Sequence, residues 1–342
     1  MMITFLVWLY LFAVVYPWLI YPAILRMNRG KLKLQGPPYE EQEWVVITAG
    51  REAGDRGKKH IEYVNWLCSC HGNAKAVYVD DGSSAAEVHN LKRCAENLDL
   101  QHLTILDMES HVGKELALDA GREHAFLHGN PTRILFLDVG VRLNGDRQTL
   151  TALEALDIDP RFRPDDVAGL AFTDTVGDPG LYIRLEMGIR DLEDMAGGLI
   201  GAGGMALAMK TDYIMAKDLR APADLTLVAD ARKAEGRMLH GGEQYQAIYS
   251  KPKNGQYMRS VRTAMRGMAG VETLPYEPWW NFKLVSHKHL RWLSSILIAV
   301  NPIALLLLIV RPSMILPHIA ILHAAVLTAS GKRVTKWEGT KR

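Results

Sequence analysis

Three charged groups each follow a short apolar segment of the sequence, close to the point where that segment ends. Asp81 belongs to an Asp-Asp-Gly-Ser-Ser turn, Lys114 stands beside a glycine, and Asp138 follows the stretch Ile-Leu-Phe-Leu. A carboxylate at such a turn can accept hydrogen bonds from a ribose or a base, and a lysine at a helix start can bind a phosphate. Each group alone would also fit an ordinary turn or a solvated surface, but three in a row favour a nucleotide-binding site.

Four apolar, β-rich segments alternate with helix-like segments in the first half of the chain. The predicted strands are residues 44–48, 76–79, 103–106 and 134–137, and the predicted helices are residues 57–70, 84–97 and 113–127. Strands that alternate with helices predict a mostly parallel sheet, in which ligands bind beyond the carboxyl ends of the strands. We therefore predict an α/β domain over residues 40–285. The serine hydroxyls after Asp81 are expected to cap the helix that follows.

Small residues and a further carboxylate mark the less regular second half of this domain. Gly203 and Gly204 belong to a Gly-Ala-Gly-Gly turn before an apolar strand, and such a turn lets a substrate approach the backbone closely. Asp224 stands at the start of a helical segment that ends at Gly236. Its carboxylate is either the N-cap of that helix or a catalytic group.

A helix with a basic face is predicted near residues 253–269. Its methionines form one stripe, and Arg259, Arg262 and Arg266 form an adjacent basic stripe by the same helical spacing. This pattern favours a helix at a membrane interface whose arginines bind a diphosphate. A surface helix with a solvated cationic face is the alternative.

Residues 3–25 contain no charged side chain and are long enough to cross a bilayer. Basic residues follow this segment, whereas a signal peptide would have a basic start. The positive-inside rule then places the N-terminus outside and the next domain in the cytoplasm. We predict an N-terminal transmembrane helix over residues 1–28.

Two further apolar segments, residues 292–310 and 313–329, predict a transmembrane hairpin over residues 288–330. A re-entrant element is the alternative for the second segment. Basic residues flank the hairpin on both sides, including the tail 331–342, so both flanks are expected in the cytoplasm. The sequence therefore predicts a multi-pass protein of the inner or plasma membrane, with the lipid bilayer as one of its partners.

The overall charge and the cysteine content narrow the class of protein. The 342-residue chain carries a formal net charge of +2, which gives no indication of a nucleic acid partner. Its three cysteines are too few for a disulfide framework, and Cys68 and Cys70 lack the two-residue gap of a redox or zinc pair. We expect reduced thiols, as in a domain on the cytoplasmic side.

Six stretches of the sequence, in this order, resemble the membrane-bound family 2 glycosyltransferases, which include hyaluronan, chitin and cellulose synthases and many exopolysaccharide transferases. They are VYVDDGSSAAE (77–87), GKELALDAG (113–121), ILFLDVGVRL (134–143), GAGGMALAMK (201–210), QYMRSVRTAMRG (256–267) and SHKHLRWLSSIL (286–297). No single stretch is decisive, but six in the same order are specific. The resemblance covers roughly residues 40 to 295.

This resemblance implies a GT-A fold, which is a nucleotide-binding αβα sandwich, with one N-terminal and two C-terminal transmembrane helices. It implies sugar transfer, with inversion at the anomeric carbon, from a UDP-type nucleotide sugar to a polysaccharide or lipid-linked acceptor. The roles carried over are Asp81 for uridine, Lys114 for the nucleotide, Asp138 for the diphosphate side of the donor and for a metal ion, Gln256 and Arg259 for the diphosphate and acceptor end, Gly203 and Gly204 for the acceptor side, and Asp224 for catalysis.

Besides Asp119 in place of an asparagine and Ser260 in place of a tryptophan, the sequence departs from the family's pattern at three points. Arg51 replaces the asparagine of an Asn-Glu pair, Gly140 replaces the second acid of the Asp-x-Asp motif, and Leu225 follows Asp224 where a second acid is expected as the base. Oxygen ligands hold Mg²⁺ or Mn²⁺, so Asp138 alone is a poor site for either ion. Either Asp224 acts as the base with a small shift in register, or the base is absent.

Two hypotheses from different classes follow. The first is a glycosyltransferase that works at the cytoplasmic leaflet, and the second is a catalytically impaired relative that acts as a subunit of a polysaccharide synthase complex. A different nucleotide-binding membrane protein is the third alternative. Three predicted spans are few for a polymer channel in one chain. The product would then stay on a lipid carrier, or a homo-oligomer or partner synthase subunit would build the pore.

Overall fold

The computed structural model describes residues 12, 16–28, 43–70, 74–144, 167–175, 181–214, 222–242, 245–249 and 277–290. The chain divides into two compact units. Unit 1 comprises Met1–Tyr21 with Phe282–Arg342, and unit 2 comprises Pro22–Asn281.

The first half of unit 2 alternates strands and helices as the sequence predicts. Its elements are β1 (Trp44–Gly50), α3 (Gly54–Ser69), β2 (Ala74–Asp80), α4 (Ala85–Asn97), β3 (Leu103–Asp107), α5 (Lys114–Leu127) and β4 (Arg133–Leu137). Each predicted strand and helix is present, with ends that shift by up to three residues. The α/β prediction is therefore confirmed for this half of the domain.

The second half of unit 2 contains one strand that the sequence predicts, the apolar strand after the glycine turn, and several short strands that the sequence pattern did not reveal. Its elements are β5 (Val141–Leu143), β6 (Val167–Ala171), β7 (Thr173–Thr175), α7 (Leu181–Met195), β8 (Ala206–Lys210), a 3₁₀ turn (Thr211–Tyr213), α8 (Ala223–Lys233), β9 (Arg237–His240) and β10 (Gln246–Tyr249). Strands β5, β7, β9 and β10 have only three or four residues, which is too short to show a clear alternation of apolar and polar side chains.

The strands form two sheets. The large sheet has the order β3-β2-β1-β4-β8-β6-β9, and β5, β10 and β7 form the small one. Strands β1 to β4 are parallel to one another where they pair, whereas β8 is antiparallel to β4, with Leu137 opposite Ala206. The carboxyl ends of β1 to β4 and the first residue of β8 therefore meet at one edge, which we call the carboxyl edge.

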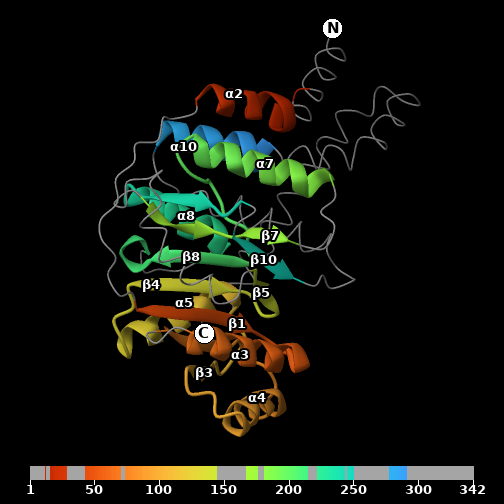
Figure 1. Cartoon of the computed structure of the whole chain (residues 1–342), viewed down its shortest axis with the longest axis vertical. Coiled ribbons are helices and arrows are strands. Elements are labelled where there is room, and N and C mark those ends of the chain that lie inside the picture. The colour runs from red at the N-terminus through yellow and green to blue at the C-terminus, as the bar shows by residue number, and fades with distance from the viewer. Residues whose placement is uncertain are drawn as a thin grey trace, which may run out of the picture. The chain divides into compact units, whose positions relative to one another are not determined.

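Helices cover both faces of the large sheet. On one face, Tyr63, Val64 and Leu67 of α3 pack in a core cluster with Val46 of β1 and Leu135 of β4. The opposite face carries a second cluster, in which α5 and α8 pack against the alternate side chains of the same strands. The strands β1, β4 and β8 lie side by side in Figure 1. This three-layer arrangement fixes the carboxyl edge between two packed cores.

In the described part of unit 1, residues 16–21 contact residues 282–286, which are far away in the sequence. It includes a π-helical turn at Tyr16–Ile20 and another at Val285–His289. The Tyr16 hydroxyl lies 3.0 Å from the Ser286 hydroxyl, and the Tyr21 ring packs 6.3 Å from the Phe282 ring, measured between centroids. Helix α2 (Tyr21–Met27) and helix α10 (Pro278–Leu284) adjoin these turns in sequence.

The predicted membrane segments fall largely outside the described residues. Within the part of the chain that the structure describes, no helix combines the length and the hydropathy that a membrane crossing needs. The predicted span over residues 1–28 is described only at residue 12 and from Tyr16 onward. The hairpin (288–330) is described only to residue 290, and the basic helix (253–269) and the tail (331–342) not at all. These segments stay predictions.

All three cysteines have free thiols, as the sequence led us to expect. Cys68 lies in the core of α3, where burial raises the pKa of its thiol to about 12. A thiol with so high a pKa is protonated and unreactive at neutral pH.

Candidate active site

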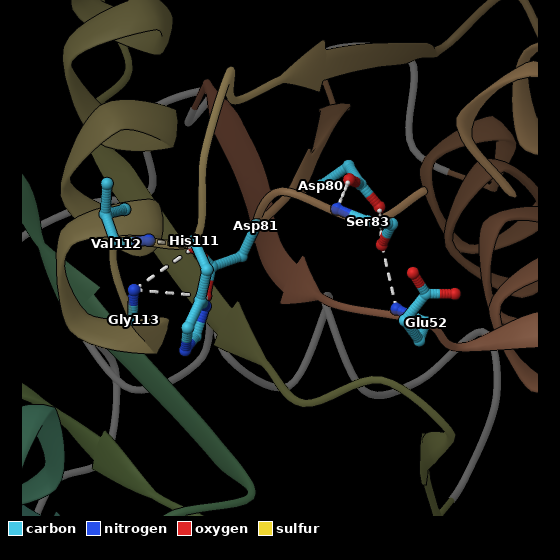
Figure 2. A network of polar contacts seen from close by, with 7 residues as sticks. All are labelled: Glu52, Asp80, Asp81, Ser83, His111, Val112 and Gly113. Carbon is cyan, nitrogen blue, oxygen red and sulfur yellow. Dashed lines mark hydrogen bonds and ion pairs between the residues drawn. The ribbon is translucent and has the colours of Figure 1, made fainter. Parts of the chain in front are cut away.

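The two adjacent acids at the end of β2 point in opposite directions, as successive side chains of a strand do. Buried Asp81 accepts hydrogen bonds from the backbone N–H groups of Val112 (2.8 Å) and Gly113 (3.1 Å), and its other oxygen lies 2.8 Å from His111 Nδ1. Asp80 instead accepts from the backbone N–H and the hydroxyl of Ser83 (Figure 2). Asp81 thus holds the loop that precedes α5, and this loop positions Lys114. The predicted contact between Asp81 and uridine stays a prediction.

Glu52 joins the ends of β1 and β2. Its backbone N–H donates to the Ser83 hydroxyl (2.8 Å), and its carboxylate accepts from the Ser84 backbone N–H (2.7 Å). The expectation that the serine hydroxyls cap α4 is wrong: Ser84 holds the N-cap position but makes no side-chain cap. The reason is the Glu52 carboxylate, toward which the Ser84 hydroxyl is directed at 3.4 Å.

Lys114 brings three of the predicted site residues together. Its ammonium pairs with the Asp138 carboxylate and donates to the backbone carbonyl of Gly204 at 3.3 Å. Burial alone would lower the pKa of Lys114, but the nearby carboxylates of Asp138 and Asp224 outweigh this effect and raise it. The ammonium therefore stays charged at neutral pH, and it links the end of β4 to the glycine turn before β8.

Asp224 lies in the first turn of α8, but it is not the N-cap. Pro222 holds that position, so the N-cap interpretation is wrong. The Asp224 carboxylate lies 3.9 Å from the position that a Cβ on Gly204 would take, and its charge acts on Lys114. Leu225 is buried instead. Of these two neighbours, the acid faces the glycine turn and the leucine faces the core, and the catalytic role of Asp224 stays a prediction.

Asp174 is a carboxylate at this edge that sequence reasoning missed. A Cβ on Gly203 would lie 2.5 Å from both of its oxygens, so only glycine leaves room for it. Burial raises the pKa of Asp174, Arg190 at 3.9 Å lowers it, and Asp224 and Asp138 raise it, with a net upward shift. The sequence signal that could have identified Asp174 is the one that identified Asp81 and Asp138: an acid shortly after an apolar segment, which here is β6.

His60 of α3, also missed, fixes the turn that contains Asp138. The backbone N–H of Gly140 donates to His60 Nδ1 (3.2 Å), which places the ring proton on Nε2. That N–H donates to the Thr48 hydroxyl (2.9 Å), and the hydroxyl donates to the carbonyl of Leu137. The chain of hydrogen bonds ties the residues on both sides of Asp138 to the core and requires a neutral imidazole.

This buried imidazole predicts a pH-dependent stability. Burial, with the charges of Arg56 and Arg142, lowers the pKa of His60 from 6.5 to about 3. The unfolded chain then binds a proton that the folded chain does not, so stability is complete above pH 6.5 and is lost as the pH falls toward 3. We expect His60 to contribute a loss of about 2 kcal/mol in the free energy of unfolding between pH 7 and pH 5.

Unfolding of the full chain by urea, followed by tryptophan fluorescence at both pH values, measures this loss. His60→Gln should show a loss smaller by about 2 kcal/mol than the native chain. His89→Gln, at an exposed position on α4, serves as the control and should match the native chain. An equal loss in the native chain and in His60→Gln would contradict the assignment.

The donor set at the carboxyl edge does not fit a Mg²⁺ or Mn²⁺ ion. The Asp138 carboxylate is already paired with Lys114. The second position of the motif is Gly140, which has a φ of +83°, and a Cβ there would lie 2.8 Å from the Arg56 side chain. Among the described residues, no group of three or more acids, histidines or cysteines could hold a metal ion.

Two predicted site residues lie outside the described residues. Gln256 and Arg259 belong to the predicted basic helix, whose placement the structure does not describe. Their roles toward the diphosphate and acceptor stay predictions. The described site thus consists of Asp81, Lys114 and Asp138 with the glycine turn at 203–204, and of Asp224 and Asp174 beside that turn.

The sheet order and the polar carboxyl edge define an α/β sandwich of the GT-A type. A solved structure with this fold is the mannosyltransferase PcManGT from Pyrobaculum calidifontis, in complex with GDP-Man and Mn²⁺. The TM-score is 0.69 at 17% sequence identity, and the match covers 96% of this chain and 92% of that chain. At this identity the likeness shows the fold alone, and the predicted GT-A fold is confirmed.

A second solved structure, residues 1–349 of S. aureus TarS in complex with UDP-GlcNAc, is less similar. Its TM-score is 0.46 at 13% identity, over 72% of this chain and 71% of that chain. No protein-family model matches the chain, and no curated protein is similar to it in sequence. The assignment to the membrane-bound family 2 branch stays a prediction.

Proposed function

We propose that this protein is a glycosyltransferase that moves a sugar from a nucleoside diphosphate sugar to a hydroxyl group of its acceptor. The observation that carries the proposal is the position of Lys114, which joins Asp138 to the glycine turn at Gly204, close to Asp224. A cation, an acid and an open backbone turn thereby meet at the carboxyl edge of a GT-A sheet, where ligands of such sheets bind. The structure of PcManGT with GDP-Man supports a nucleotide-sugar donor.

The chemistry assigns one role to each group. Asp224 accepts the proton of the acceptor hydroxyl, whose oxygen attacks the anomeric carbon from the side opposite the diphosphate. The bond from that carbon to the diphosphate breaks, and positive charge at the site stabilises the departing group. A single displacement of this kind inverts the anomeric centre. Gly204 leaves space for the acceptor beside the base, since only the Asp224 carboxylate lies within 4 Å of its Cβ position.

The proposal also includes the cellular location of the protein and the class of its acceptor. The apolar segments at both ends of the sequence support a membrane protein whose active domain faces the cytoplasm. They favour an acceptor that is a polysaccharide or a lipid-linked sugar within reach of the bilayer. The Asp-Asp-Gly-Ser turn at Asp81 favours a UDP-type donor, whereas the similar PcManGT structure contains GDP-Man.

A catalytically impaired subunit of a synthase complex is the second candidate. Gly140 favours this alternative, because it replaces one of the acids that a metal ion would need. The buried position of Leu225 weighs against it, since Asp224 faces the glycine turn and remains available as a base.

Turnover of nucleotide sugars by the purified full chain separates the two candidates. We expect release of a nucleoside diphosphate from at least one UDP- or GDP-sugar, measured in a coupled assay with and without Mn²⁺. No turnover with any donor tested, while a partner subunit co-purifies with the chain, would contradict the enzyme and support the second candidate.

A further inference from the structure

The side chain of Arg56 covers the place where the second acid of an Asp-x-Asp motif would extend. A Cβ built on Gly140 lies 2.8 Å from Arg56 Cδ, 3.1 Å from Cγ and 3.3 Å from Nε. The backbone of Gly140 has a φ of +83°, which disfavours most other residues. Gly140 therefore does more than remove a metal ligand: the absence of a side chain at residue 140 leaves the space that the Arg56 side chain fills.

Arg56 is held in this place by an aromatic side chain from the small sheet. Its Nη1 donates to the Tyr249 hydroxyl at 3.2 Å, and its guanidinium lies 6.0 Å from the centroid of the Tyr249 ring. Tyr249 of β10 pairs with Val141 of β5, the residue that directly follows Gly140. The anchor thus lies on the strand that pairs with β5, and the glycine directly precedes β5, so the arginine lies across the turn that carries Asp138.

The guanidinium keeps donors for a ligand. Arg56 is exposed, and a guanidinium has five N–H donors, of which the bond to Tyr249 uses one. Lys114 neutralises Asp138, the acid that would otherwise repel an anion at this turn. A planar guanidinium binds phosphate oxygens in pairs, so the surface beside Gly140 suits a phosphate group better than a divalent cation.

We propose that Arg56, together with Lys114, binds the donor's diphosphate directly and takes the place of the divalent cation that an Asp-x-Asp motif would hold. The inference deepens the proposed function, since the diphosphate is that of the nucleotide-sugar donor. It explains why Gly140 and Arg56 occur together: an acid at residue 140 would meet the arginine, and the arginine supplies the positive charge that a metal ion would bring. Diphosphate binding is then independent of Mg²⁺ and Mn²⁺.

Binding of UDP, GDP and inorganic pyrophosphate to the full chain tests this inference, measured by calorimetry in EDTA and again in millimolar Mn²⁺. We expect the affinity for the best of these ligands to differ by less than about threefold between the two conditions. Arg56→Ala should weaken binding in EDTA by about 10- to 100-fold, because it removes hydrogen bonds between charged groups. Arg56→Lys, which keeps the charge and the fold of α3, should lose part of that affinity. Arg93→Ala, at an exposed arginine of α4, is the control and should bind as the native chain does.

A double variant tests the exchange of cation for arginine. In Arg56→Ala/Gly140→Asp the new carboxylate has room, and aspartate tolerates a positive φ better than most residues. Its binding of the same ligand should become dependent on Mn²⁺, with at least a tenfold gain on addition of the ion. Native binding that requires Mn²⁺, no binding in either condition, or an unchanged affinity in both Arg56→Ala and Arg56→Lys would overturn the inference.

The result of the binding experiments can be distinguished from the result of the turnover assay that tests the proposed function. Metal-independent binding that depends on Arg56, without any sugar turnover, would support the inference on diphosphate binding and contradict the enzyme. Turnover that occurs only with Mn²⁺ would support the enzyme and overturn the inference.

Discussion

Replacing Asp224 by asparagine is expected to lower the rate of sugar transfer by about 10²- to 10⁴-fold, the range typical of losing a general base. Asparagine has nearly the same shape as aspartate but cannot accept the acceptor's proton. The helix start should be preserved, because Pro222 is the N-cap and the Asp224 side chain makes no cap. The affinity for the nucleotide should therefore change by less than about threefold, so the loss appears in kcat.

Two further variants make this test specific. Asp212→Asn, at an exposed acid of the 3₁₀ turn after β8, is the control and should leave kcat unchanged. Asp174→Asn addresses the other carboxylate beside the glycine turn. If Asp224→Asn keeps its activity and Asp174→Asn loses it, the base is Asp174 and the assignment of Asp224 is wrong.

The first half of the fold was predictable because its pattern is local. Strands β1 to β4 are short apolar segments separated by helical segments, so the alternation alone predicts the parallel sheet. The rule that ligands bind at carboxyl ends then selects Asp81 and Lys114 without any structure. The structure confirms that these groups lie at one edge, and it adds that Asp81 holds the loop before Lys114.

The residues that sequence reasoning missed act through contacts between distant parts of the chain. His60 bonds to Gly140, 80 residues away, and Arg56 bonds to Tyr249, 193 residues away. Neither side chain belongs to a recognisable motif, since both lie on α3 among other polar residues. Their roles depend on how α3 packs against the turn after β4, and no local pattern specifies that packing.

Two of the departures from the family's pattern are also interpreted differently once the structure is known. From sequence, Gly140 and Leu225 both indicate lost catalytic acids. In three dimensions, Arg56 lies over Gly140, whereas Leu225 is buried and leaves Asp224 beside the glycine turn. A missing acid is therefore evidence of impairment only when no other group can take over the function that the acid served.

The second large effect is expected at Gly82, between the acids of β2 and the serine turn. Gly82 has a φ of +68°, and a Cβ there would lie 2.3 Å from the backbone nitrogen of His111 and 2.4 Å from the carbonyl carbon of Ser110. Both neighbours are backbone atoms, which cannot move aside as a flexible side chain can. Gly82→Ala should therefore push the loop at 110–113 away from β2 and break the hydrogen bonds to Asp81. We expect a loss of about 2–4 kcal/mol in stability, by strain and overpacking.

Gly54→Ala separates the clash from the backbone strain. Gly54 has a similar φ of +56°, but nothing lies within 4 Å of its Cβ position. It should lose about 1 kcal/mol through strain alone and keep its nucleotide affinity. Thermal unfolding of the full chain and calorimetric binding of UDP and GDP measure both effects. Because Asp81 positions the loop that presents Lys114, Gly82→Ala should also weaken nucleotide binding at least tenfold at temperatures where it is folded. Equal stability losses in the two variants would contradict the clash at Gly82. A folded Gly82→Ala chain with native affinity would show that this loop does not position the nucleotide-binding lysine.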